Sequence, residues 1–168
     1  MKNTLNVSTP TDLEVVMTRD FNASRDLVWQ AMTTPEFIMR WLFGPPGWTM
    51  TVCEDDLKVG GKFRWEWSGP DGTGMAMRGV YREVVPPERV SRTESFEFGC
   101  APQSGEQLAT IVLTERADKT SLKLTVLYPT KEACDGAVAS GMATGVGASY
   151  DLLEAMLAAS DFPQGVQQ

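Results

Sequence analysis

The spacing of apolar residues along the chain changes twice, and each change predicts a different kind of secondary structure. Apolar and polar residues alternate from 13 to 21, which predicts a half-buried strand. Apolar residues three and four positions apart then predict two short helices, the first capped by Ser24 and the second ending at Leu42, before a Gly-Pro-Pro-Gly turn. The first part of the chain is therefore expected to fold as a strand followed by a pair of helices.

The period changes to two after residue 47, and the alternating runs that follow predict six further strands. The turns between these runs are short and rich in Gly, Pro and Asp, so successive strands are expected to pair as an antiparallel meander. The predicted strands cover residues 48–54, 62–68, 75–85, 89–98, 107–116 and 121–128.

Helical spacing returns after Pro129, where Thr130 is the predicted cap of a short helix over 131–140. A longer helix, ending near residue 159, is predicted from an apolar stripe made of Met142, Val146, Tyr150, Leu153 and Leu157. One packing accounts for this order of elements: an antiparallel sheet of about seven strands bends around the last helix, and the two short helices fill the gap between the first two strands. The predicted fold class is α+β.

The length of 168 residues fits a single domain, which we place at residues 13–159. A domain of this size buries enough apolar surface to need no disulfide or metal for stability. Residues 1–12 and 160–168 are rich in Ser, Thr, Asn, Gln and Pro, so both segments are expected to be flexible tails.

Charge and apolar content exclude two classes of partner. The net charge of -7 and the sequence pI of about 4.6 oppose binding to nucleic acid. The chain contains neither an apolar run of signal-peptide length nor one of about 20 residues that would span a membrane. We therefore expect a cytoplasmic protein, a monomer or homodimer, that contacts neither nucleic acid nor membrane.

Histidine is absent, and the three cysteines are far apart without a CxxC pair. These counts predict reduced thiols and no metal site, and they exclude catalytic designs that depend on histidine. The Gly-rich turns lack the spacing of a phosphate loop, and Asp55-Asp56 is interpreted as a solvated turn. No cofactor is predicted.

Several short motifs, diffuse one by one but specific in their order, make the chain resemble a known family between residues 14 and 158. It resembles the bacterial homologues of the activator of the heat-shock-protein-ninety ATPase, within the START-like helix-grip superfamily that is also called SRPBCC. Val146 departs from the family, in which many members carry Trp or Met at this position. The residues that carry the resemblance are Arg19, Phe21, Ala23, Val28-Trp29, Pro35-Glu36, Trp41, Gly44-Pro45, Val59-Gly60-Gly61, Pro86-Pro87-Glu88-Arg89-Val90, Ser140-Gly141-Met142 and Ser149-Tyr150-Asp151.

The resemblance implies a helix-grip fold that encloses a small apolar or aromatic ligand between the sheet and the C-terminal helix. A cavity of roughly 300 Å³ or more is then expected, although the same side chains would also serve to fill a core. Trp41 and Trp48 flank the Gly-Pro-Pro-Gly turn, where they either gate an entrance or cap the hydrophobic plug. The candidate ligand-binding residues are Trp41, Trp48, Phe63, Trp65, Trp67, Met77, Tyr81, Glu94, Phe96, Met142, Val146 and Tyr150.

Strand register makes one of these candidates more specific. Pairing the strands on either side of Pro86-Pro87 so that Met77 lies opposite Phe96 places Gly79 opposite Glu94, with all four residues on the cavity side. A slip of one residue would pair Arg78 with Glu94 instead. The first register matches apolar with apolar residues and is the one we predict.

Glu94 would then be a carboxylate entering an apolar space, next to a cation that is either Arg19 or Arg92, the latter opposite Tyr81 in the same register. A structural ion pair is one interpretation of this group. A cyclase- or dehydratase-like enzyme, implied by other helix-grip members, is the alternative function, with Glu94 and Tyr150 as weak candidates for acid–base catalysis. A chaperone-associated interaction protein, suggested by the family name, is the other alternative.

Overall fold

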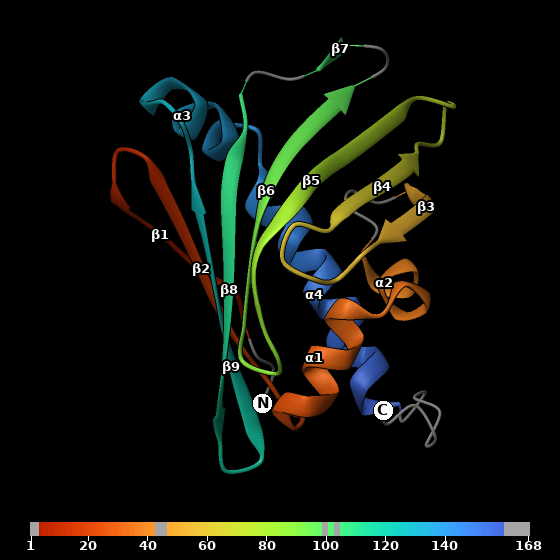
Figure 1. The fold of residues 1–168 in the computed structure, drawn as a ribbon, viewed down its shortest axis with the longest axis vertical. Coiled ribbons are helices and arrows are strands. Elements are labelled where there is room, and N and C mark those ends of the chain that lie inside the picture. Colours follow the sequence, from red (N-terminus) through yellow and green to blue (C-terminus); the bar gives the residue numbers. More distant parts are fainter. Residues whose placement is uncertain (1–3, 43–46, 99–100, 103–104, 160–168) are drawn as a thin grey trace.

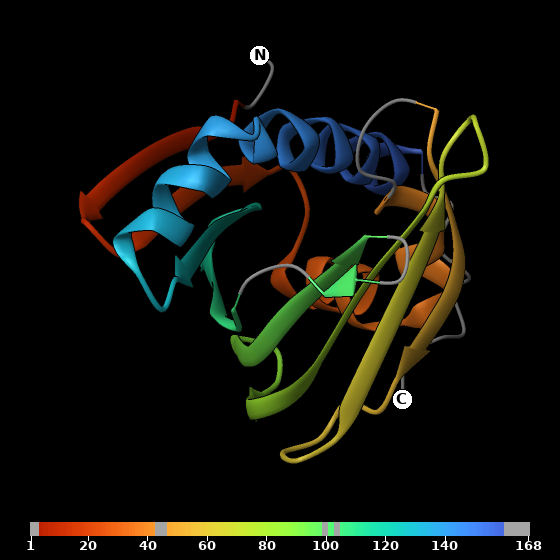
Figure 2. The same cartoon turned by 90° about the horizontal axis from the view of Figure 1, so that it is seen from above.

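The computed structural model describes residues 4–42, 47–98, 101–102 and 105–159 (Figure 1). One antiparallel sheet wraps around the C-terminal helix, and two short helices stand beside it at one end (Figures 1 and 2). The helices are α1 (Arg25–Thr33), α2 (Pro35–Trp41), α3 (Lys131–Ala139) and α4 (Met142–Ala158). The strands are β1 (Asn6–Thr11), β2 (Glu14–Phe21), β3 (Thr49–Asp55), β4 (Lys62–Ser68), β5 (Gly74–Val85), β6 (Arg89–Phe98), β7 (Ala101–Pro102), β8 (Gln107–Arg116) and β9 (Lys119–Leu127).

The predicted meander is confirmed: the strand order in the sheet is β1-β2-β9-β8-β6-β5-β4-β3, and the short β7 pairs with β6 alone. The fold is the α+β helix-grip arrangement, with more strands than the seven expected because β1 and β7 are added. Hydroxyls cap two of the helices as predicted, since Ser24 accepts from the backbone of Leu27 and Thr130 from that of Ala133.

The expectation of a flexible tail over residues 1–12 is wrong for residues 6–11. These residues form β1, which pairs antiparallel with β2 through pairs such as Val7 with Met17. Every side chain of β1 is exposed, so the strand has no apolar face, and backbone hydrogen bonds to β2 hold it in place. The predicted tail at 160–168 lies outside the described residues.

An ion pair fixes α4 over the concave face of the sheet. Arg19 of β2 donates from Nη1 to Oδ1 of Asp151 at 2.7 Å, and its Nη2 lies 3.7 Å from Glu154. The guanidinium also lies 5.1 Å from the centre of the Phe21 ring. Tyr150 of α4 packs edge-on against Phe21 at 5.6 Å, so α4 is anchored to β2 by both polar and aromatic contacts.

The register of β5 and β6 follows the apolar-matching prediction. Met77 pairs with Phe96 and Tyr81 pairs with Arg92, which places Gly79 and Glu94 at corresponding positions between these pairs. The side chain of Glu94 is buried on the concave side of the sheet. The predicted register is therefore confirmed, and the alternative pairing of Arg78 with Glu94 is excluded.

Gly79→Ala should destabilise the fold by roughly 3 kcal/mol, because the two strands leave no room for a methyl group. A Cβ atom added at Gly79 would lie 1.8 Å from the carbonyl oxygen of Thr93 and 2.8 Å from the Phe63 ring. Gly74→Ala in the same strand is the matched control, since nothing lies within 4 Å of a Cβ there. Urea unfolding measures both variants, and equal stability of the two would contradict the close strand approach.

Candidate ligand-binding site

The predicted ligand-binding residues fall into a buried and a half-buried group. Eight are buried: Trp41, Phe63, Trp65, Trp67, Met77, Tyr81, Glu94 and Tyr150. Four are half-buried: Trp48, Phe96, Met142 and Val146. The buried group lies on the concave side of the sheet, on α2 and on the face of α4 that meets them, as predicted for Trp65 and Glu94.

Aromatic rings on β4 and β5 form a continuous wall on the concave face. The ring centres of Phe63 and Trp65 are 4.7 Å apart, and Trp67 stands edge-on to Trp65 at 6.4 Å. Tyr81 of the neighbouring strand lies 5.5 Å from Phe63. The alternation of β4 produces this wall, because every second residue of the strand points into the interior.

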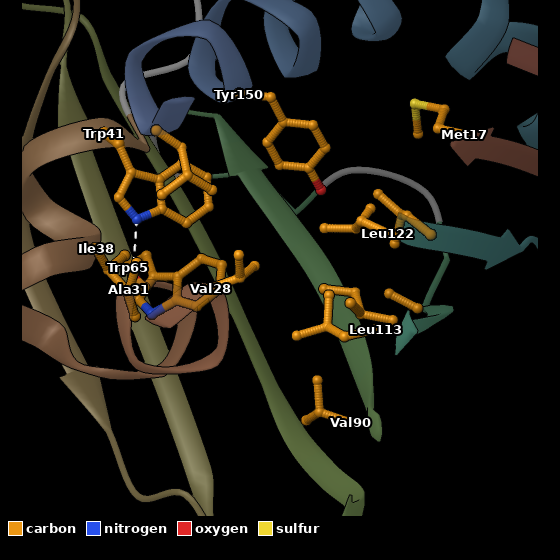
Figure 3. Close-up of a cluster of buried hydrophobic side chains, with 14 of the residues drawn as sticks. Met17, Val28, Ala31, Ile38, Trp41, Trp65, Val90, Leu113, Leu122 and Tyr150 are labelled. Carbon is orange, nitrogen blue, oxygen red and sulfur yellow. Dashed lines mark hydrogen bonds between the residues drawn. The ribbon is translucent and has the colours of Figure 1, made fainter. Parts of the chain in front are cut away.

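Trp41 lies buried between α1 and α4. Its indole Nε1 donates to the carbonyl oxygen of Ala31 at 2.9 Å, and its ring lies 5.9 Å from that of Tyr150 (Figure 3). Trp48 is half-buried, and its ring packs against Gly69, where an added Cβ would lie 3.0 Å from ring atoms. Residues 43–46 of the turn between them lie outside the described residues.

Arg92 is the cation that accompanies Glu94. Its Nε donates to Oε2 of Glu94 at 2.9 Å, and the other carboxylate oxygen accepts from Nε2 of Gln107 at 2.8 Å. The guanidinium lies 4.9 Å from the centre of the Trp65 ring and 5.5 Å from that of Phe63. Burial opposes the charged form of Arg92, but Glu94, Tyr81 and Asp55 outweigh it, and the pKa of the guanidinium is raised.

Asp55 is a polar residue beside the site that the sequence interpretation missed. It is the last residue of β3, pairs with Phe63, and accepts a hydrogen bond from the Tyr81 hydroxyl at Oδ1, at 2.7 Å. The interpretation as a solvated turn is therefore wrong for Asp55. The irregular pairing between Met50 and Val52 shifts the alternation of β3, which brings Cys53 and Asp55 into register with inward-facing residues of β4.

Asp55→Asn should change how stability depends on pH. Burial raises the pKa of the Asp55 carboxyl above its ordinary 3.8, and this outweighs the opposite effects of Tyr81, Arg92 and Trp65. The folded protein therefore holds the Asp55 proton more tightly than the unfolded chain, and the associated stability is present below pH 3.8 and lost as pH rises through the raised pKa. In urea unfolding from pH 3.5 upwards, the free energy of unfolding of the variant should rise relative to that of the wild type as the pH increases. A difference in unfolding free energy that stays constant with pH would contradict the raised pKa.

Tyr150 is a buried phenol on the face of α4 that meets the sheet. Figure 3 shows its hydroxyl pointing from α4 into the interior. Burial raises the pKa of this phenol, with Arg92 opposing and Glu94 adding to the shift, so the hydroxyl stays protonated at neutral pH. Burial raises the pKa of Tyr81 in the same way. Neither phenol is suited to act as a general base.

A small pocket lies between α1 and strands β5, β6 and β8. Its volume is about 10 Å³, which is enough for roughly one water molecule. Of the predicted ligand residues, Tyr81 alone lines it. The lining consists of Trp29, Met32, Thr33, Leu57, Tyr81, Val90, Arg92, Ile111 and Leu113.

This pocket does not meet the expected volume of about 300 Å³. A second pocket of about 300 Å³ lies outside the grip, between β1 and α3. The described side chains of the interior thus pack more closely than the sequence analysis expects.

Among the residues that the structure describes, neither a metal-binding cluster nor a membrane-spanning helix is found. Within the ranges given above, no three His, Cys, Asp or Glu side chains are grouped so that they would hold a metal ion. No helix in the same part of the chain is long and apolar enough to cross a membrane.

Comparisons with known proteins agree with this architecture. The family model described as "Activator of Hsp90 ATPase homolog 1-like protein" matches residues 22–158. A crystal structure of a Rhodobacter sphaeroides protein is 33% identical, covers 93% of this chain and 99% of its own, and superposes with a TM-score of 0.87. A Mycobacterium smegmatis protein is 24% identical over 94% of this chain and 99% of its own, with a TM-score of 0.82, which shows the shared fold.

No curated protein matches the chain. The matched family model nevertheless spans most of it and includes every candidate site residue. The chain belongs to the family of Activator of Hsp90 ATPase homolog 1-like proteins, with a START-like helix-grip fold.

Proposed function

We propose that the protein binds a small apolar or aromatic molecule in the interior of the helix grip. The observation that carries this proposal is a fixed cation, Arg92, lining a pocket whose other walls are mostly apolar. A START-like fold is a general ligand-binding scaffold, which is consistent with the proposal. Concave, mainly apolar pockets with a few convergent polar groups are the usual form of small-molecule sites.

A stable core does not require a charge at this position. Replacing a buried ion pair by apolar residues is often neutral or stabilising, so the Arg92–Glu94 pair is weak evidence for a purely structural role. Nε of Arg92 is bound to Glu94, whereas the described residues offer no hydrogen bond to its terminal amino groups. A polar atom of a ligand in the pocket would find these donors already oriented.

A ligand larger than one water molecule must displace side chains around the pocket. Met32, Thr33 and Leu57 line one side of it and are half-buried, so they are the side chains that can move at the lowest cost. Methionine is flexible and adapts to different shapes. We therefore place ligand entry between α1 and the segment that follows β3.

Met32→Trp should abolish saturable binding of an uncharged apolar dye, N-phenyl-1-naphthylamine, because an indole at this position fills the entrance. Met39→Trp is the matched control: Met39 lies on α2, is 36% exposed and does not line the pocket. Dye fluorescence and quenching of tryptophan emission measure binding. Absence of saturable binding to the wild type, or equal binding by both variants, would refute the proposed site.

The enzyme alternative gains no support from the geometry. Glu94 is held between Arg92 and Gln107, and the phenols of Tyr81 and Tyr150 remain protonated. The interaction alternative rests on the family name, and a shared fold does not carry function.

A further inference from the structure

The pocket of about 300 Å³ between β1 and α3 takes no part in the proposed ligand site. α3 packs against β2 and α4, and β1 lies beyond β2 at the edge of the sheet, so a space remains between the helix and this edge (Figures 1 and 2). The volume is at the lower end of the range for small-molecule sites. The pocket therefore has room for a small ligand as it stands.

The lining of this pocket carries negative charge from two elements. Asp12, in the turn between β1 and β2, and Asp135 of α3 both belong to it, and neither Lys nor Arg is among the described lining residues. Burial raises the pKa of the Cys134 thiol in the same lining, and both carboxylates raise it further, with Lys131 opposing them. Asp12 and Asp135 therefore act on the same point of the pocket.

Acceptor atoms of the pocket remain available to a ligand. Lys131 donates to Oδ2 of Asp135 at 2.7 Å, and no described residue donates to Oδ1 of the same carboxylate. The Asp12 carboxylate and the Thr9 hydroxyl likewise make no hydrogen bond or ion pair with any part of the chain that the structure describes. Three acceptor groups, one on α3 and two on the hairpin of β1 and β2, are thus free.

An apolar wall completes the pocket. Cys134 is 2% exposed and forms no disulfide, and its thiol has no hydrogen-bond partner within the described ranges. Val138, one turn further along α3, is 48% exposed, so its side chain is open to contact with a ligand. The combination of free acceptors with an apolar wall suits a molecule that has a cationic head and a hydrocarbon body.

Other ligand classes fit this lining less well. An anion would be repelled by the two carboxylates, and a neutral alcohol has one donor for three acceptor groups. A metal ion is not supported, since no three Cys, Asp or Glu side chains of the described residues are grouped as metal ligands. A primary ammonium group has three donors and no acceptor, which matches the lining in charge and in number.

We infer that the pocket between β1 and α3 binds a small organic amine in its protonated form. The ammonium group donates to Asp12, Asp135 and Thr9, and the hydrocarbon body lies against Cys134 and Val138. This site is separate from the interior of the helix grip and does not depend on the proposed function.

Titration of ¹⁵N-labelled protein at pH 7, followed by amide chemical shifts, tests the inference because it gives both the affinity and the location of binding. The probes are phenethylamine, 2-phenylethanol, phenylacetate and phenethyltrimethylammonium, which all carry a phenyl ring on a short chain. Phenethylamine should shift amides of β1 and α3 saturably. It should bind about fivefold more tightly than each of the others, the upper end for an exposed charge pair.

Asp12→Asn should remove most of this preference, since the variant keeps the shape of the side chain and deletes one charge. Asp118→Asn is the matched control: Asp118 is also an exposed acid in a turn between two strands, but it does not line the pocket. Phenethylamine should bind to this control as it does to the wild type. The dispersion of the amide spectra shows that both variants are folded.

Several outcomes would overturn the inference. Equal binding of 2-phenylethanol would leave only apolar contact, and equal binding of the trimethyl compound would exclude donation by the ammonium. Shifts confined to β5 and β6 would place the amine in the interior pocket, which would support the proposed function and contradict this site. Tighter binding of Nα-acetyl-lysine N-methylamide would assign the pocket to lysine side chains of another protein. Absence of saturable shifts in β1 and α3, or unchanged affinity in Asp12→Asn, would also contradict the site.

Discussion

Trp65→Ala is expected to lower the free energy of unfolding by ~3 to 5 kcal/mol, because it empties a large volume in the closed part of the grip. The side chain is 2% exposed and contacts the rings of Phe63 and Trp67, and the guanidinium of Arg92 lies over it. Removal of the indole would therefore leave a cavity and deprive a buried cation of its aromatic neighbour. Urea unfolding monitored by circular dichroism measures the loss.

Trp48→Ala is the control for this prediction. Trp48 is half-buried and packs against Gly69 at the turn between β4 and β5, so its removal should cost clearly less. A loss below ~1 kcal/mol for Trp65→Ala would show that the interior collapses around the missing ring and that the wall is not tightly packed.

Glu94→Gln is expected to destabilise the protein by ~3 to 5 kcal/mol, because it leaves the charge of Arg92 buried without a counter-ion. The two side chains are 13% and 8% exposed, and Nε of Arg92 lies 2.9 Å from Oε2 of Glu94. The variant also places an amide between two donors, Arg92 and Gln107, where the carboxylate accepted from both. Equilibrium unfolding in urea gives the magnitude.

The double variant Arg92→Met with Glu94→Leu tests whether the stability lost in Glu94→Gln comes from the unpaired charge of Arg92. Replacing both charges by apolar residues is expected to restore most of the stability that Glu94→Gln loses. The single variant Arg92→Met completes the cycle and isolates the coupling between the two groups. A double variant no more stable than either single one would contradict a direct pair.

Most of the fold is predictable because the buried side of a strand or helix requires apolar residues at regular intervals along the sequence. β4, β6 and β8 begin and end at the predicted residues, because turn-forming residues bound each of them, and β4 also alternates apolar and polar positions throughout. β1 could not be found in this way, because all of its side chains are exposed and pairing with β2 leaves no apolar pattern.

The candidate site is less predictable than the fold. Register identified Glu94 as an inward-facing acid, and the choice between Arg19 and Arg92 then required knowing which cation lies nearer in space. Asp55 was missed because the predicted strand ended at residue 54 and the acidic pair after it was interpreted as a solvated turn, whereas β3 extends to Asp55. The pocket volume depends on how closely the inward side chains pack against one another. The alternation of apolar and polar residues shows which side chains face inward but not how closely they pack.

The two edge strands of the open sheet, β1 and β3, differ in how each is kept from pairing with a strand of another molecule. α2 packs against β3, whereas β1 is fully exposed. Pro10 within β1 has no N–H to donate, so it interrupts the ladder that a foreign strand would need. Proline in an edge strand is one of the features that disfavour edge-to-edge association of sheets.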